Sequence, residues 1–309
     1  MTSVIESTIS NAKDALISPW ITQGMVSFSG QQLPDATAGR HGWILRADAK
    51  LVQIRWAIEA ITSPELASMP PAKARLLIYR RALTLIDAEF GPINKKERES
   101  TARKLQEIAL SLWRARHSAS RAPISPADRL ALIASFDKGQ PYCWICGVRF
   151  SSSATEAFIR GKRFLSTSQL FVDFAYPRGR NKSDLAVTVD HVLPVAAGGT
   201  NDLDNLRLCC SWCNTAKSDA LDVYRSGQYR GSYEHPTLGM FMLPSYSWVS
   251  RLLALVGACS DCGRNQADGP LVIAASSAVR QLNPAFLRIY CLDHDPWADE
   301  RIVPAKGLP

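Results

Sequence analysis

The sequence lacks several features that would each place it in a large class of proteins. No run of eighteen or more apolar residues occurs, so no segment is predicted to span a bilayer. The start of the chain lacks the basic residues and continuous apolar stretch of a secretory signal, and we expect a cytoplasmic protein. No internal repeat and no Gly-x-x-x-x-Gly-Lys-Ser/Thr loop is found, so the chain carries no visible NTPase site.

Composition and charge indicate a folded protein with basic segments. The 309 residues, 46% of them hydrophobic, suffice for two or three domains with apolar cores. The net charge is +8, and residues 93–121 hold eight Lys and Arg against three acids, while residues 160–182 hold six against one. Such clusters suit a polyanionic partner, because each neutralised phosphate releases counterions. The alternative is a solvated helix face followed by a soluble loop.

The first 120 or so residues are predicted to be helical. Apolar side chains recur at helix spacing within three stretches, residues 51–61, 76–90 and 105–113. Helix-breaking segments at 63–71 and 91–94 separate them. Such stripes are typical of a packed core. We therefore expect a helical domain over residues 1–124 that binds a substrate or partner and carries no catalytic chemistry.

Shorter signals define the middle of the chain. Ser125 followed by Pro126 predicts the start of a helix. A β-branched run at 186–189 predicts a short strand, and a helix is expected from about residue 204 onward. Residues 147–187 lie between a Cys-x-x-Cys turn and this strand and contain serine-rich, basic and aromatic stretches. We interpret them as an insertion.

Eight cysteines are present, and most fall in closely spaced groups. In a cytosolic chain such grouping favours metal binding over disulfides. Two Cys-x-x-Cys turns supply thiolates for a closed, structural Zn²⁺ site formed by Cys143, Cys146, Cys210 and Cys213. Cys209 lacks the two-residue gap to Cys213 and is expected to be a small buried side chain. A Cys-x-x-Cys and a Cys-x-x-His turn predict a second structural Zn²⁺ site, formed by Cys259, Cys262, Cys291 and His294.

One segment, "VDHVLPVAAGGTNDLDNLRLCCSWCNTAK" at residues 189–217, combines several short motifs. An Asp-His pair is followed by a proline, two glycines, an Asn-Leu and a Cys-x-x-Cys-Asn-x-x-Lys turn. In this order and spacing the segment resembles the HNH nuclease family, also called the ββα-metal fold, in its form with zinc-binding turns on either side. The resemblance covers roughly residues 140–220 and implies an α+β fold with a nuclease core at residues 125–225.

The resemblance and the chemistry of phosphodiester hydrolysis together imply roles for five residues. His191 is the expected general base, because imidazole titrates near neutral pH. Asp190 and Asn214 are expected to bring oxygen atoms to one catalytic ion, and oxygen ligands favour Mg²⁺ or Mn²⁺. Asn205 would pin the loop that carries the base, and Lys217 would contact a phosphate. The alternatives are that Asp190 caps a helix or turn, that His191 is a buried histidine with satisfied hydrogen bonds, and that Asn205 is a helix N-cap. For Lys217 the alternative is an exposed surface lysine.

The insertion and the end of the chain complete the expected organisation. Candidate contacts to a nucleic-acid backbone are the six basic residues Arg160, Lys162, Arg163, Arg178, Arg180 and Lys182. Phe164, Phe171 and Tyr176 could stack on bases, although core packing is the commoner fate of aromatic side chains. Residues 226–309 are expected to form a small ribbon-like element around the second zinc site.

The leading hypothesis is a metal-dependent endonuclease that hydrolyses phosphodiester bonds, foremost in DNA, with a role in restriction or phage defence. One alternative is a non-catalytic nucleic-acid-binding module that kept the zinc scaffold. Another is a nuclease subunit activated by a partner ATPase, since the chain has no visible NTP-binding loop of its own. RNA is an alternative substrate, and the protein could form a homodimer. No membrane partner is expected.

Overall fold

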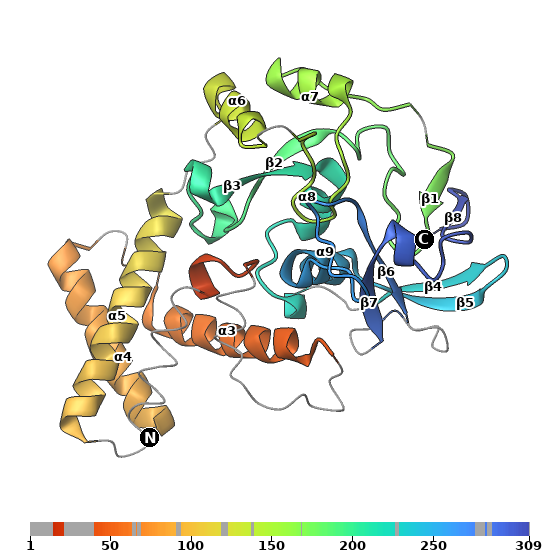
Figure 1. Cartoon of the computed structure of the whole chain (residues 1–309). Helices are drawn as coiled ribbons and strands as arrows, with labels where there is room; N and C mark the ends of the chain where they lie inside the picture. Colours follow the sequence, from red (N-terminus) through yellow and green to blue (C-terminus); the bar gives the residue numbers. More distant parts are fainter. Residues whose placement is uncertain are drawn as a thin grey trace.

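The computed structural model combines helices with small antiparallel sheets (Figure 1). It describes residues 15–21, 40–63, 66, 69–90, 94–118, 123–136, 139–167, 169–225, 229–275, 282 and 286–308. The named helices are α3 (Gly42–Ile61), α4 (Pro71–Phe90), α5 (Lys95–Ser118), α6 (Pro126–Ala134), α7 (Ser152–Ile159), α8 (Ser211–Lys217) and α9 (Tyr246–Val256). The short 3-10 turns are η2 (Val195–Ala197), η3 (Leu203–Asn205), η4 (Val223–Arg225) and η5 (Leu292–His294).

The strands form antiparallel pairs, each joined by its own hydrogen-bond ladder. They are β1 (Phe171–Asp173), β2 (Val187–His191), β3 (Leu206–Cys210), β4 (Tyr229–His235), β5 (Gly239–Pro244), β6 (Leu271–Ala275), β7 (Leu287–Cys291) and β8 (Ile302–Pro304). The pairs are β1 with β8, β2 with β3, β4 with β5, and β6 with β7. Helices next to small antiparallel sheets are consistent with the predicted α+β class.

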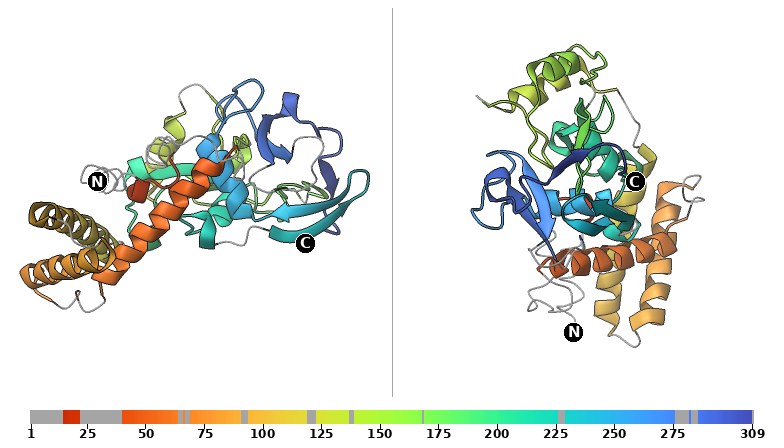
Figure 2. Two further views of the ribbon diagram at one scale, coloured as in Figure 1. Left: turned by 90° about the horizontal axis from the view of Figure 1, so that it is seen from below. Right: turned by 90° about the vertical axis from the view of Figure 1, so that its right-hand side faces the viewer.

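The three helices predicted in the first 120 residues are confirmed, and each extends beyond its predicted stretch as α3, α4 or α5. Helices α4 and α5 pack against each other on one side of the molecule, and α3 connects this pair to the rest (Figures 1 and 2). The apolar stripe of α3 explains its position, because Leu51, Ile58 and Ile61 are buried. None of the described helices is both long and apolar enough to cross a membrane.

Helix α6 begins where Ser125 and Pro126 predict it. The Ser125 hydroxyl oxygen accepts a hydrogen bond from the Asp128 amide at 3.1 Å, and the Asp128 carboxylate accepts one from the Ser125 amide at 3.3 Å. This capping box satisfies amide groups that the first helical turn leaves without partners. Helices α6 and α7 then pack against the β2–β3 hairpin.

The hairpin of β2 and β3, followed directly by α8, lies at the centre of the chain's fold (Figure 1). The strand predicted at 186–189 is confirmed as β2. The helix expected from about residue 204 is wrong in its start, because residues 206–210 pair with β2 as a strand and α8 begins at Ser211. Residues 206–210 are extended because they pair with β2, where Leu206 lies opposite His191 and Arg207 opposite Asp190. The local pattern of apolar residues cannot predict this tertiary contact.

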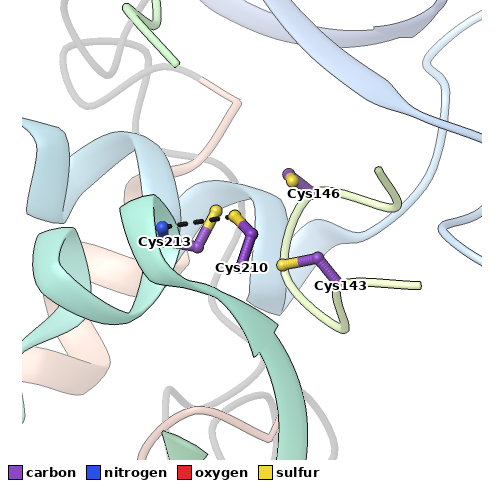
Figure 3. A group of neighbouring side chains, drawn as sticks. All are labelled: Cys143, Cys146, Cys210 and Cys213. Carbon is purple, nitrogen blue, oxygen red and sulfur yellow. Dashed lines mark hydrogen bonds between the residues drawn. The ribbon is translucent and has the colours of Figure 1, made fainter. Parts of the chain in front are cut away.

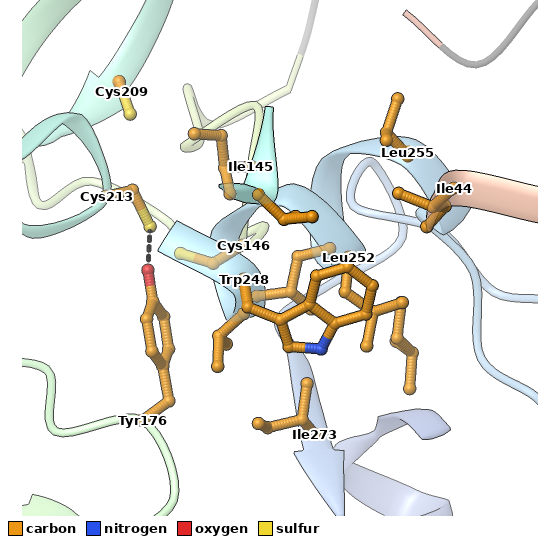
Figure 4. Packing of buried hydrophobic residues seen from close by; sticks show 14 of the residues in the cluster. Ile44, Ile145, Cys146, Tyr176, Cys209, Cys213, Trp248, Leu252, Leu255 and Ile273 are labelled. Atoms are coloured by element: carbon orange, nitrogen blue, oxygen red, sulfur yellow. Dashed lines mark hydrogen bonds between the residues drawn. The ribbon is translucent and has the colours of Figure 1, made fainter. Parts of the chain in front are cut away.

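A continuous core of buried side chains runs through all three predicted segments of the chain. It includes Leu51 of α3, Leu208 of β3 and Leu252 of α9. Figure 4 shows Trp248 and Leu252 of α9 packed among side chains from other elements, including Ile145 and Ile273. The boundaries expected at residues 124 and 225 stay predictions.

Buried ion pairs connect the helical region to the C-terminal half. The Asp48 carboxylate of α3 pairs with the Arg251 guanidinium of α9, and it also accepts the Val223 amide at 3.1 Å. Arg55, about two helical turns further along α3, pairs with Asp222. Burial raises the pKa of Asp48, and the Arg251 charge opposes that rise. Because buried charges require partners, these pairs fix how α3 sits against α9 and against the start of η4.

His41 provides a pH-dependent contact between the start of α3 and β7. Its Nε2 atom lies 3.0 Å from the Leu287 carbonyl oxygen, and the side chain is buried. Burial, together with Arg40 and Arg288, lowers the pKa of His41 to about 4, although the hydrogen bond to Leu287 opposes this. The unfolded chain therefore binds a proton between pH 6.5 and 4 that the folded chain does not.

We predict that the free energy of unfolding falls by about 1 kcal/mol between pH 7 and pH 5.5 through His41 alone. His41→Gln keeps an N–H donor for the Leu287 carbonyl but does not titrate, so its stability should fall less over this range. Urea unfolding of both proteins at the two pH values measures the difference, in which all other titrating groups cancel. An equal fall in the free energy of unfolding for the two proteins between these pH values would contradict the assignment.

Candidate active site and zinc clusters

The end of β2 and the middle of α8 line one cleft, with a volume of about 980 Å³. Asp190, His191 and Asn214 all contribute to its wall. Asp190 and His191 are neighbours on a strand, so their side chains leave the backbone on opposite faces. The predicted base and both predicted ion ligands nevertheless line a single cleft at the end of β2, which Pro194 and Thr215 also line.

His191 is held through one of its two ring nitrogens. Its Nε2 atom lies 2.8 Å from the Oδ1 atom of Asn201, a residue of the loop between η2 and η3. A carboxamide oxygen only accepts hydrogen bonds, so this contact selects the tautomer with the proton on Nε2. Nδ1 is then the nitrogen that can accept a proton. Sequence reasoning missed Asn201, and its only signal was a polar side chain in the glycine-containing loop after the histidine.

Asn205 ties down the loop that follows His191. Its Oδ1 atom accepts the Leu193 amide at 2.8 Å, and its Nδ2 atom donates to the carbonyls of Leu193 at 3.1 Å and Thr200 at 2.9 Å. Gly199 is needed at this point, because a Cβ atom there would lie 1.8 Å from the Leu193 carbonyl oxygen. The contacts match the loop-pinning role that the resemblance implies for Asn205.

Asp190 has a hydrogen-bond partner at each carboxylate oxygen. Oδ1 accepts the Lys217 ammonium at 2.9 Å, and Oδ2 accepts the Trp144 indole N–H at 3.1 Å. Burial raises the pKa of the Asp190 carboxyl, and the Lys217 charge opposes the rise. The pair joins the end of β2 to the last turn of α8.

The expectation that Lys217 contacts a phosphate, or lies exposed on the surface, is wrong for this structure. The side chain is fully buried, and its Nζ atom donates to Asp190 and to the His191 carbonyl oxygen at 2.6 Å. A buried ammonium is stable only beside such acceptors. Lys217 therefore holds the Asp190–His191 strand end from inside the protein.

A residue of the N-terminal region covers this ion pair. The Lys217 Nζ atom lies 5.2 Å from the centre of the Trp20 ring, within cation–π range. Trp20 is buried and donates its indole N–H to the Ala220 carbonyl at 3.0 Å. The Arg251 guanidinium also lies 5.2 Å from the same ring. The N-terminal region, for which the sequence predicted no chemistry, thus contacts the buried Lys217 that holds Asp190.

The fit of a catalytic ion can be judged from the donor atoms in the cleft. Asn214 donates its Nδ2 protons to the Thr188 hydroxyl at 3.1 Å and the Val189 carbonyl at 3.2 Å, so its Oδ1 atom is the one that can serve a ligand. Each Asp190 oxygen keeps a second lone pair beside its present partner. Asp190 and Asn214 both line the cleft, and carboxylate and carboxamide oxygens are donors that fit Mg²⁺ or Mn²⁺ better than softer ions.

The first cysteine cluster assembles from two separate parts of the chain. The sulfur atoms of Cys143, Cys146, Cys210 and Cys213 lie within 4.8 Å of one another and could hold a metal ion. Figure 3 shows the loop that carries Cys143 and Cys146 facing the junction of β3 and α8. The Cys213 amide also donates to the Cys210 sulfur at 3.4 Å, which caps α8. This cluster is compatible with structural zinc.

Two residues predicted to contact nucleic acid instead surround this cluster. The Arg178 guanidinium donates to the Cys146 sulfur at 3.2 Å. The Tyr176 hydroxyl lies 2.7 Å from the Cys213 sulfur, and burial raises the pKa of this phenol (Figure 4). The predictions of a backbone contact for Arg178 and of base stacking for Tyr176 are therefore wrong, because both side chains are committed to thiolates.

The other predicted basic contacts separate into two kinds. Arg180 donates to the Leu308 carbonyl at 3.1 Å, which ties it to the C-terminal segment. Arg160 is exposed and pairs with Glu156 at 2.5 Å within one turn. Four of the six are exposed and stay candidates for nucleic-acid contact: Arg160, Lys162, Arg163 and Lys182.

The second cysteine cluster lies in the C-terminal segment. The sulfur atoms of Cys259, Cys262 and Cys291 and a ring nitrogen of His294 lie within 4.8 Å of one another, as the spacing predicted, and the cluster is compatible with structural zinc. It packs against the first cluster's loop. The Leu271 amide donates to the Cys146 carbonyl at 3.0 Å, and a Cβ atom at Gly147 would lie 2.4 Å from the Gly269 carbonyl oxygen.

The family comparison agrees with this geometry. Residues 179–220 match the HNH endonuclease family model. The resemblance predicted from the motifs is therefore confirmed for this stretch, which we call the HNH segment, and it indicates nuclease activity on nucleic acid. The segment contains β2, β3 and α8, with Asp190, His191 and Asn214. No curated protein and no solved structure matches the chain.

We predict two Zn²⁺ ions per chain, and a matched pair of variants tests the first site. Cys210→Ala should reduce the zinc content to one ion per chain, because three thiolates leave the tetrahedral site incomplete. Cys209→Ala removes an adjacent, equally buried thiol outside the cluster and should keep both ions. Elemental analysis of the purified proteins gives the counts. Loss of zinc from Cys209→Ala, with both ions kept in Cys210→Ala, would reverse the assignment.

Proposed function

We propose that the protein is a metal-dependent endonuclease that hydrolyses phosphodiester bonds in DNA, with a role in restriction or phage defence. The observation that carries the proposal is the convergence of His191, Asp190 and Asn214 on one cleft within the HNH segment. An imidazole beside oxygen donors for a hard cation is the combination that water attack on a phosphodiester requires.

His191 acts in this proposal as the general base. Its Nδ1 atom takes a proton from the water that attacks the phosphorus atom, while Asn201 keeps the other ring nitrogen protonated. The water oxygen forms a bond to phosphorus, and the bond from phosphorus to the leaving oxygen breaks. Asn205 keeps the loop after His191 closed, so that the ring does not swing away from the cleft.

Asp190 and Asn214 would hold the divalent ion, which when bound neutralises charge on the phosphate and on the leaving oxygen. Lys217 and Trp144 fix the Asp190 carboxylate in one orientation before any substrate arrives. A fixed carboxylate avoids reorganisation during the reaction, which is the main advantage of a preorganised site.

One observation favours a second candidate function. Both Asp190 oxygens already accept hydrogen bonds from within the protein, and the Lys217 ammonium already balances the Asp190 charge. Such a site suits a non-catalytic nucleic-acid-binding module that kept its zinc frame. Binding without cleavage, at any concentration of Mg²⁺ or Mn²⁺, distinguishes this module from an endonuclease.

We predict that the purified protein nicks or cuts plasmid DNA in Mg²⁺ or Mn²⁺, and that Zn²⁺ does not replace these ions. His191→Ala should lower the rate by about 10²–10⁴-fold, the usual contribution of a general base. Zinc content and thermal unfolding should stay unchanged, because the cysteine clusters are untouched. Full activity in EDTA, or a wild-type rate for His191→Ala, would overturn the mechanism. Parallel reactions with RNA, and with a candidate partner ATPase, define the substrate and any activation.

We predict that Asn201 is a positioning residue for the base. Asn201→Ala should lower kcat by about 10–100-fold with little change in KM, since the histidine ring loses its orienting acceptor. Asn201→Asp supplies an oxygen acceptor at the same position and should recover most of the activity. If the alanine and aspartate variants are equally impaired, the contact contributes only to loop structure.

A further inference from the structure

A second groove opens beside the catalytic cleft. Its volume is about 420 Å³, and Pro123, Ile124 and Val189 line both the groove and the cleft. The two hollows therefore lie next to each other, along β2 and the segment before α6. A polymer chain seated in the cleft with its scissile bond near His191 would run directly into this groove.

Three basic side chains line the groove: Arg129 lies on α6, and Lys162 and Arg163 lie in the segment after α7. Arg129 of α6 donates to the Phe158 carbonyl at 3.4 Å, and its guanidinium lies 5.9 Å from the Phe158 ring. Gly161 makes room for it, because a Cβ atom there would lie 2.4 Å from the Arg129 Nη1 atom. Lys162 and Arg163 are exposed, and neither forms an ion pair within the described part of the chain. The groove thus offers positive charge that no acid of its own neutralises.

The remaining wall of the groove is apolar. Phe158 and Phe164 line it together with Val187 and Val189. Both rings are only partly buried, so an edge or face of each stays accessible from the groove. Aromatic rings beside basic side chains form the usual combination for binding unpaired nucleotides, because bases stack on the rings while the cations contact the phosphates.

We propose that this groove holds one unpaired nucleotide of the DNA strand, adjacent to the bond that is cut. This inference rests on the proposed function and names the form of its substrate. The base packs against Phe158 and Phe164, and the phosphates on either side of it contact Lys162 and Arg163. The volume lies within the range of about 300–1,000 Å³ typical of small-ligand sites, which suits one nucleotide and not a duplex. A paired base has both faces stacked and cannot reach the rings.

Binding measurements on the full-length protein test the groove separately from catalysis. All proteins carry His191→Ala, and fluorescence anisotropy reports their affinity for four labelled DNAs: a single strand, a fully paired duplex, a duplex with one unpaired base, and the same duplex with an abasic site at that position. We expect the single strand and the duplex with the unpaired base to bind more tightly than the paired and abasic duplexes.

Two variants separate the contributions of ring and charge. Phe164→Leu keeps most of the packing volume but removes the ring, and should weaken binding of the unpaired base about fivefold or more while leaving the abasic duplex unaffected. Lys162→Ala combined with Arg163→Ala should weaken binding of all four DNAs and flatten the salt dependence. The matched control is Arg288→Ala combined with Lys306→Ala, which removes the same charges from exposed positions outside the groove and outside residues 1–124. The control should bind like its parent.

The outcomes distinguish the two proposals. If DNA binds but both groove variants behave like the charge control, the groove proposal is overturned and the proposed function stands. If the base-dependent binding is found but the wild-type protein cuts no nucleic acid, the groove stands and the endonuclease activity is overturned. If no nucleic acid binds at all, both proposals fail.

Discussion

The buried pair between Asp190 and Lys217 is the interaction on which the rest of the site depends. It joins the last turn of α8 to the end of β2, and the same ammonium holds the His191 carbonyl. Trp144 reaches the other Asp190 oxygen from the first cysteine loop, and Trp20 covers the ammonium from the N-terminal region. Removing either member would leave an uncompensated buried charge, which costs about 3–5 kcal/mol. Three distant parts of the sequence are thereby fixed around one carboxylate.

The two cysteine clusters provide a frame for that arrangement, and they are not independent. The first connects the Cys143–Cys146 loop to the start of α8, where Asn214 follows Cys213 directly. The second cluster's segment packs onto the first loop through the Leu271 amide and the close approach of Gly147 to Gly269. The orientation of Asn214 therefore depends on contacts that extend into the C-terminal segment.

Local sequence signals predicted those parts of the site that are encoded within a few residues. The Cys-x-x-Cys spacing identified both clusters, and the order of motifs around Asp190 and His191 identified the HNH segment. The roles predicted for Lys217, Arg178 and Tyr176 were wrong, because the position of each side chain depends on partners far away along the chain. The helix expected from about residue 204 failed for the same reason, since pairing with β2 decides the conformation of residues 206–210. Helix stripes and the Ser125 cap, which are local, were predicted correctly.

The contact of Trp20 with Lys217 has a consequence for how the HNH segment relates to the rest of the protein. A fragment restricted to residues 179–220 would keep Asp190 and its lysine, but would lose the indole rings of Trp20 and Trp144 and two of the four sulfur ligands of the first cluster. Water would then enter beside the ammonium. The HNH segment is accordingly not a module that could be excised or grafted, because Trp20 of the N-terminal region is part of its interior.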